Sequence, residues 1–209
     1  TQNGLVDTSY GVNGIVNQVN SGNIKLSGNE ILNFYQDKIS KTSITGNAVN
    51  TFGSAGIFTY PTSKYYHSKL SPSGNINSLD LDGFDFVNIS PSGVLINEIN
   101  LTNDNNTLDY YSNFTSDGTR YFFVGSSNDN NPFVVSYSND GTLANLNNQQ
   151  SYKETTIPLG NYTSVLYKEN ALYVGGDRKD AITQGWHYVV VKYNFSSLGT
   201  TEVKRKKTV

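Results

Sequence analysis

DGTRYFFVGSSNDNNPFVVSYSNDGTL, residues 117–143, is the stretch that decides the fold of this chain. Asp117-Gly118 and Asp140-Gly141 are residue pairs that tolerate the positive φ angles of tight hairpin turns, and β-branched and aromatic residues flank both. Residues 121–124 and 133–135 are apolar at consecutive positions, which is typical of strands covered on both faces. The stretch therefore predicts two hairpins that share a middle strand, in a sheet that lies between other layers.

Composition favours strands and turns over the whole chain. Only 15% of the 209 residues are charged, whereas there are 15 Tyr, 10 Phe and 19 Gly. The absence of Cys excludes disulfides, thiol nucleophiles and Cys-ligated zinc. No apolar run is long enough to insert into a membrane, and a chain that opens with Thr1 and lacks Met is expected to be a processed or excised piece.

The charge distribution argues against a general nucleic-acid binder. The formal net charge is −2, and the one positive cluster is the tail at residues 204–207, Lys-Arg-Lys-Lys. Such a tail is expected to be a solvated end or a charged guard on an edge strand rather than an anion site.

Degenerate repeats extend the hairpin pattern along the chain. First turns centre on Gly28, Gly74, Gly118 and Asn170, which lie 46, 44 and 52 residues apart, and second turns follow near Gly46, Gly93, Gly141 and Ser197. The repeats run over about 20–57, 58–96, 97–150 and 151–203, each the length of one propeller blade. We therefore expect an all-β, β-propeller-like fold of about four four-stranded antiparallel blades, one domain over 1–203, with a basic tail at 204–209.

The most specific motif precedes the first full repeat. In NGLVDTSYGVNGIVNQV, residues 3–19, eight positions match the closing half of a delta-60 repeat, and the chain resembles bacterial surface and secreted β-propellers of that type. The matching residues are Leu5, Asp7, Thr8, Ser9, Tyr10, Gly11, Gly14 and Ile15. NTFGSAGI at 50–57 repeats the motif more loosely, and ENALYVGGD at 169–177 returns its middle part. The resemblance implies an extracellular or cell-surface location.

Residues 3–19 also bear on how the blades close. They supply an outer strand without preceding partners, while the last repeat ends in the poor strand TTEVKRKK. This arrangement predicts a lap joint that closes four blades. The alternative is that the chain is a fragment of a larger propeller.

No pattern of residues predicts catalysis. The two histidines, His67 and His187, lie 120 residues apart without metal-ligand spacing, and both are expected to be packed or surface residues. No nucleophile elbow, phosphate-binding glycine loop or paired-carboxylate helix is present. We expect a protein without enzymatic activity.

One acidic cluster offers a metal hypothesis. Asp80, Asp82 and Asp85 lie in LDLDGFD, beside Gly83, as in oxygen-rich calcium loops. The Glu that ends such loops is missing, which favours a polar loop whose Asp side chains cap turns. Calcium is the one cofactor that the sequence suggests.

Recognition is expected on the connections between second and third strands. These connections run over about 36–38, 77–83, 126–132 and 177–185, and variable insertions on one face of a repeat scaffold usually carry binding. The last is the longest and leads into an aromatic residue that can stack on a sugar or anchor a protein contact. The candidate ligand-binding residues are Asp177, Arg178, Lys179, Asp180, Trp186 and His187. The competing expectation is that Trp186 packs against the neighbouring blade.

These features favour a non-catalytic, secreted or cell-surface module for binding or adhesion that recognises a protein or glycan at one propeller face. The alternatives are a structural spacer segment of a larger extracellular or phage-fibre protein and, less favoured, a propeller glycoside hydrolase.

Overall fold

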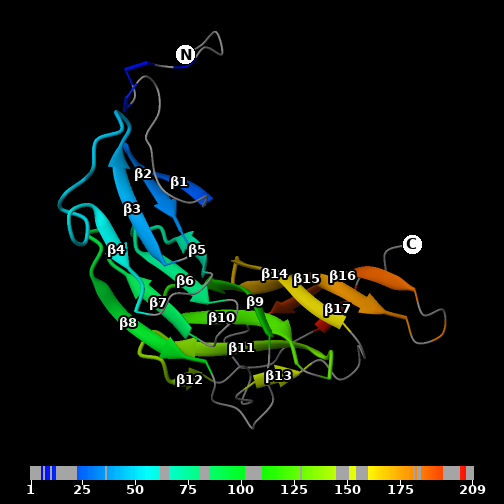
Figure 1. Ribbon diagram of the computed structural model, residues 1–209. Coiled ribbons are helices and arrows are strands. Elements are labelled where there is room, and N and C mark those ends of the chain that lie inside the picture. Colours follow the sequence, from blue (N-terminus) through cyan, green and yellow to red (C-terminus); the bar gives the residue numbers. More distant parts are fainter. Residues whose placement is uncertain are drawn as a thin grey trace. The chain divides into compact units, whose positions relative to one another are not determined.

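A computed structural model describes residues 6, 8–9, 11–12, 23–35, 37–61, 66–80, 85–101, 110–127, 129–144, 151–153, 160–180, 182, 185–194 and 203–205. Strands are the only regular elements in this part of the chain, and none of its residues forms a helix that could cross a membrane. The chain divides into two compact units, Thr1–Glu98 and Ile99–Val209. Figure 1 shows the strands in chain order from blue to red.

The first unit contains two antiparallel sheets, each a meander in which neighbours in sequence are neighbours in space. The first sheet has the order β1 (Asn23–Ser27), β2 (Glu30–Phe34), β3 (Lys38–Ser43) and β4 (Ile57–Thr59). The second has the order β5 (Tyr66–Leu70), β6 (Ile76–Asp80), β7 (Asp85–Ile89) and β8 (Leu95–Asn100), and the boundary between the units falls within β8.

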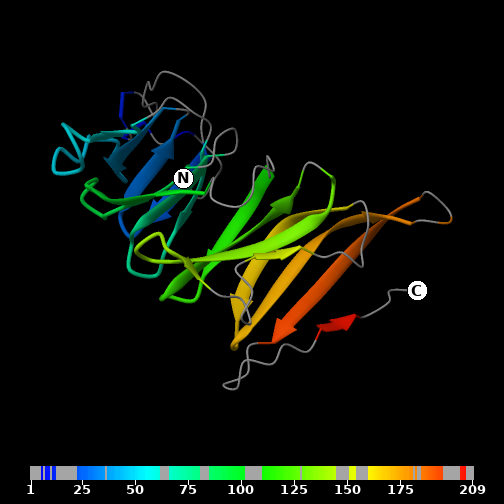
Figure 2. The ribbon, with the colours of Figure 1, turned by 90° about the horizontal axis from the view of Figure 1, so that it is seen from below.

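The second unit repeats this architecture with longer strands (Figure 2). The third sheet contains β9 (Tyr110–Ser116), β10 (Arg120–Ser126), β11 (Pro132–Ser138) and β12 (Leu143–Ala144), and β13 (Ser151–Lys153) also pairs with β11. The fourth contains β14 (Gly160–Lys168), β15 (Ala171–Lys179), β16 (Trp186–Asn194) and β17 (Val203–Arg205). Four meanders of propeller-blade type confirm the predicted all-β fold class; a single domain over 1–203 stays a prediction.

Hairpin turns lie where the sequence predicts them. Gly28, Gly74, Gly118 and Asn170 have positive φ between the first and second strands of the four sheets. Gly46, Gly93 and Gly141 have positive φ in the second turns of the first three sheets, and the expected turn near Ser197 lies outside the described residues. The doubly covered strands are also confirmed, because Phe122, Phe123 and Val134 have no exposed surface.

Several strands extend beyond the approximate bounds that the sequence suggests for repeats, connections and tail. The third sheet extends past 150 because β12 covers only two residues of β11, which leaves the edge at Phe133–Val135 to pair with β13. The second sheet likewise extends past 96, to Asn100. The connections expected at 77–83 and 177–185 begin later, since their first residues continue the ladders of β6 and β15. The basic tail expected at 204–209 begins inside β17, which pairs with β16.

Successive residues of the second strand point to opposite faces of a sheet, and we use this alternation to name the two faces. In the first, third and fourth sheets we call the face that carries the third and fifth residues of that strand the forward face, and the opposite one the backward face. The forward faces carry Leu32 and Phe34 in the first sheet, Phe122 and Val124 in the third, and Tyr173 and Gly175 in the fourth.

Each unit has its core between its two sheets. In the first unit, Leu32, Phe34 and Ile39 of the first sheet pack with Ile76, Val87 and Ile89 of the second. In the second unit, the forward face of the third sheet packs on the backward face of the fourth. That core contains Phe122, Val124, Val134, Tyr162, Val165, Leu172, Val174, Val191 and Tyr193. Aromatic and branched side chains thus join sheet to sheet, as is usual for layered β architectures.

Candidate functional site

The predicted binding residues of the last connection are divided between the two faces of the fourth sheet. Antiparallel pairing places Lys179 opposite Trp186, Arg178 opposite His187 and Asp177 opposite Tyr188. Because successive strand residues point to opposite faces, Asp177, Lys179 and Trp186 lie on the forward face and Arg178 and His187 on the backward face.

Asp180 closes the connection between β15 and β16. Its N–H donates to the carbonyl of Gly185 at 2.8 Å, and its carboxylate accepts the N–H of Ile182 at 2.8 Å. The carboxylate therefore acts as a turn residue of the kind that Asp commonly fills. Among the predicted residues this leaves Asp177, Lys179 and Trp186 as the set that the structure brings together on one surface.

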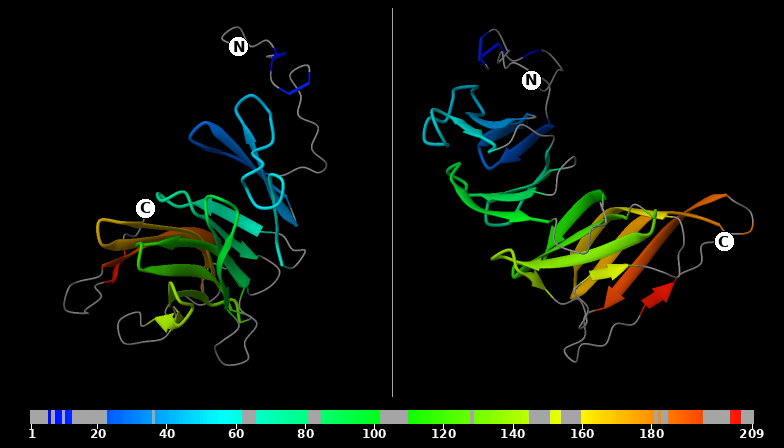
Figure 3. Two further views of the ribbon diagram at one scale, coloured as in Figure 1. Left: turned by 90° about the vertical axis from the view of Figure 1, so that its left-hand side faces the viewer. Right: turned by 60° about the horizontal axis from the view of Figure 1, so that its bottom comes forward.

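The forward face of the fourth sheet is exposed and apolar. Trp186, Tyr188 and Val190 alternate along β16, with 62%, 92% and 65% of their surfaces exposed. On β14, Leu166 is opposite Tyr173 and is also exposed. A contiguous row of large apolar side chains is unusual on the surface of a protein. Figure 3 shows β14, β15 and β16, in yellow to orange, side by side in one broad sheet of the second unit.

Charged residues border this apolar row. Lys192 lies opposite Tyr173, with its Nζ 5.3 Å from the centroid of the phenol ring. Lys179 and Asp177 lie opposite Trp186 and Tyr188 at the other end of the ladder. An aromatic centre with a polar border is the usual composition of a recognition surface.

Tyr188, Val190, Leu166, Tyr173 and Lys192 were not among the predicted site residues. The two-residue alternation in WHYVVVKYN, residues 186–194, is the signal that finds three of them. The expectation that Trp186 packs against a neighbouring blade does not describe this chain, in which the indole is largely exposed.

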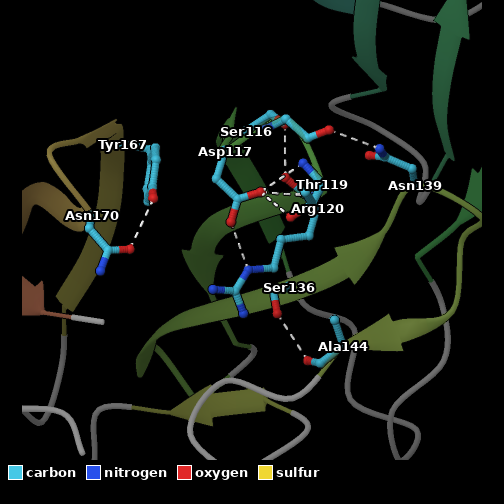
Figure 4. A network of polar contacts seen from close by, with 10 residues as sticks. Ser116, Asp117, Thr119, Arg120, Ser136, Asn139, Ala144, Tyr167 and Asn170 are labelled. Carbon is cyan, nitrogen blue, oxygen red and sulfur yellow. Dashed lines mark hydrogen bonds and ion pairs between the residues drawn. The ribbon is translucent and has the colours of Figure 1, made fainter. Parts of the chain in front are cut away.

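The turn of the third sheet shows how the polar residues of this fold are used structurally (Figure 4). One oxygen of Asp117 accepts the N–H groups of Thr119 and Arg120 at 2.9 Å, and the other accepts Nε of Arg120 at 2.9 Å. Burial raises the pKa of Asp117, but the hydrogen bonds from Arg120 and Thr119 outweigh it, and the net pKa lies below the ordinary carboxyl value. This network fixes the hairpin.

The predicted calcium residues flank one connection of the second sheet. Asp80 ends β6 and is fully buried, Asp85 begins β7, and Asp82 lies outside the described residues. Across the described ranges no group of three or more His, Cys, Asp or Glu side chains is placed to hold a metal ion. Calcium binding stays a prediction.

A basic cluster lies in the first unit. Burial lowers the pKa of His67, and the charges of Lys69 and Lys25 lower it further. Burial likewise lowers the pKa of Lys69 to about 8, with a further contribution from Lys25. His67 and Lys69 lie on β5 and Lys25 lies on β1, so the cluster contains residues from both sheets of this unit.

No protein-family model matches the chain, and no curated protein matches it. Among solved structures, Ycf48 bound to a D1 peptide matches with a TM-score of 0.49 and 11% identity, over 83% of this chain and 51% of that chain. An engineered GH43 glycoside hydrolase matches with a TM-score of 0.49 and 8% identity, over 87% of this chain and 39% of that one.

Virginiamycin B lyase from Staphylococcus aureus matches with a TM-score of 0.47 and 13% identity, over 89% of this chain and 70% of that chain. The chain spans less than two thirds of the Ycf48 and hydrolase structures that it matches. All three are β-propeller proteins, and the likeness concerns the fold.

Proposed function

We propose that this chain is a non-catalytic binding module of a secreted or cell-surface β-propeller, and that it recognises a protein or glycan through the forward face of its fourth sheet. The observation that carries the proposal is the exposed row of Trp186, Tyr188 and Val190. Trp and Tyr supply large contact areas at a small cost in side-chain entropy, and they dominate the binding energy of many interfaces.

The polar border supports recognition rather than bare adhesion. Lys179, Asp177 and Lys192 lie beside the aromatic side chains on the same face. They offer both donors and acceptors to the hydroxyls of a sugar or to the polar atoms of a protein surface. The repeats resemble the delta-60 type, and that resemblance supports a secreted or cell-surface location.

The test is binding of the isolated chain to a glycan array and to whole cells. Trp186→Ala and Tyr188→Ala are expected to weaken binding roughly tenfold or more each, as is usual for aromatic hot spots. Ile182→Ala is the matched control, because Ile182 is 92% exposed on the neighbouring connection but lies off the sheet face. Equal binding by all four proteins would overturn the site, and no binding by the unaltered chain would overturn the function.

A purely structural spacer is the second candidate. The forward face of the third sheet favours this candidate. Its side chains Phe122, Val124 and Val134 pack the third sheet on the fourth, so a face of this kind can have a purely structural use. A spacer would bind neither glycans nor cells, so the same assay separates the two functions.

A further inference from the structure

The two units use the same joint between successive sheets. The forward face of the first sheet packs on the second sheet, and the forward face of the third packs on the backward face of the fourth. Among the described residues, the forward face of the fourth sheet and the backward face of the first carry exposed apolar side chains.

A lysine fixes the joint in the first unit. Lys41 lies opposite Leu32 on the third strand of the first sheet. Its Nζ donates to the carbonyl of Pro91 at 2.8 Å and forms an ion pair with Glu30 at 2.7 Å. Pro91 lies in the second turn of the second sheet, directly after Ser90. The lysine thus joins one sheet to the turn backbone of the next.

Lys192 has the same position in the fourth sheet. It lies opposite Tyr173, the third residue of its second strand, as Lys41 lies opposite Leu32. It also lies over an aromatic ring, as Lys41 does over Phe52 at 5.2 Å. The forward face of the fourth sheet therefore has a lysine and apolar side chains like those of a joint, but Trp186, Tyr188 and Val190 on it are exposed.

The first sheet has the turn that such a joint needs. Ser43 and Ser90 each accept, through the carbonyl, the N–H of a glycine three residues on, at 2.9 Å. Ile44 therefore occupies the position of Pro91, and its side chain is 54% exposed. On the backward face beside this turn, Ile24 and Leu26 are 67% and 70% exposed.

A second contact marks the same surface of the first sheet. The N–H of Gly53, which follows the third strand of the first sheet, donates to Ser92 in the second turn of the second sheet at 2.8 Å. The N–H of Gly11 donates in the same way to Thr45 of the first sheet at 3.1 Å. The φ angles of the two glycines are +53° and +57°. The segment at Gly11 thus makes with the second turn of the first sheet the contact that the segment at Gly53 makes with the second turn of the second sheet.

We propose that the forward face of the fourth sheet of one copy docks on the backward face of the first sheet of a second copy. Trp186, Tyr188 and Val190 pack near Ile24 and Leu26, and Lys192 donates to the carbonyl of Ile44. The contact is head-to-tail, because two different surfaces meet. The inference rests on the proposed function in one respect, which is that the forward face of the fourth sheet binds a partner. It identifies that partner as a second copy of this chain.

Sedimentation velocity over a wide concentration range tests the proposal. We expect the unaltered chain to associate, and we expect Val190→Lys or Leu26→Glu to weaken the association roughly 100-fold or more by placing a charge in an apolar contact. Lys192→Ala is expected to weaken it roughly tenfold. Val94→Lys is the control, because Val94 is 60% exposed on a turn outside both faces.

Mixing the two charged variants makes the test specific. The Leu26→Glu copy keeps an intact forward face and the Val190→Lys copy an intact backward face, so their mixture is expected to form one contact and stop at a dimer. Association that Val190→Lys abolishes and Leu26→Glu does not would show a symmetric contact between forward faces and overturn the proposal. A strict monomer at all concentrations would overturn it as well.

The same variants separate this inference from the proposed function. Leu26→Glu leaves the forward face of the fourth sheet intact. Binding of this variant to glycans or cells reports on the function, and its sedimentation reports on the docking. Failure of one measurement therefore does not decide the other.

Discussion

The forward faces of the third and fourth sheets occupy the same position in successive meanders but have opposite surroundings. In the third sheet Phe122 and Val124 are fully buried against the fourth. In the fourth sheet, Tyr173 is half-buried, and Val190 and Tyr188 beside it are exposed. The difference shows that similar strand patterns are buried where a sheet packs on them and exposed where no sheet among the described residues does.

Phe122 and Tyr173 occupy equivalent positions in the third and fourth sheets, and their truncation to Ala should show the largest contrast in unfolding free energy. The ring of Phe122 is stacked on Tyr167, with centroids 5.8 Å apart. Phe122→Ala should lower the free energy of unfolding by about 3–5 kcal/mol. Tyr173→Ala should cost less, about 1–2 kcal/mol, because the Tyr173 side chain is only partly buried. Urea unfolding followed by circular dichroism measures both, and equal losses would mean that the fourth sheet's forward face is packed.

Two adjacent glycines of β15 should give a smaller contrast. A Cβ on Gly176 would collide with the carbonyl oxygen of Asn161, whereas one on Gly175 meets only the Cβ of Ser164 at 3.7 Å. Gly176→Ala should therefore cost about 1–3 kcal/mol. Gly175→Val, which gives the fourth sheet the side chain that Val124 gives the third, should change stability by less than about 0.5 kcal/mol.

A large loss of unfolding free energy in Gly175→Val would contradict this prediction. It would show that the forward face of the fourth sheet is already filled. The same unfolding assay gives the answer, with the unaltered chain as reference.

The turns made the fold predictable from the sequence. Glycines and Asn170 at positions of positive φ mark seven hairpin turns, and consecutive apolar residues such as Phe122 and Phe123 mark strands between layers. Both signals are local, so they can be recognised without knowledge of the tertiary structure.

The binding surface was predictable only in part. Asp177, Arg178 and Lys179 have the composition of a loop, but their pairing with β16 makes them strand residues and divides them between two faces. The exposure of the forward face of the fourth sheet could not be predicted either, because Tyr173-Val174 resembles Phe122-Phe123 in sequence. Which of two similar strands is covered depends on what lies next to it in space.

A partly buried charge in the first unit should make the stability of the protein depend on pH. Burial lowers the pKa of Lys69 to about 8, below its value in an unfolded chain. Between that pH and about 10 the unfolded state binds more protons, so stability should rise with pH over this window. Lys69→Met should remove this rise. Urea midpoints at pH 7 and pH 9.5 measure it, and equal pH slopes for the two proteins would contradict the burial of Lys69.

Iodide quenching of Trp186 tests the exposed forward face most directly, because Trp186 is the one Trp of the chain. In the Leu26→Glu variant, in which docking is blocked, the fluorescence should be quenched readily, and Trp186→Ala should leave the melting temperature nearly unchanged. At concentrations where the unaltered chain associates, quenching should fall. An indole that iodide cannot reach in the Leu26→Glu monomer, together with a large loss of melting temperature in Trp186→Ala, would contradict the account.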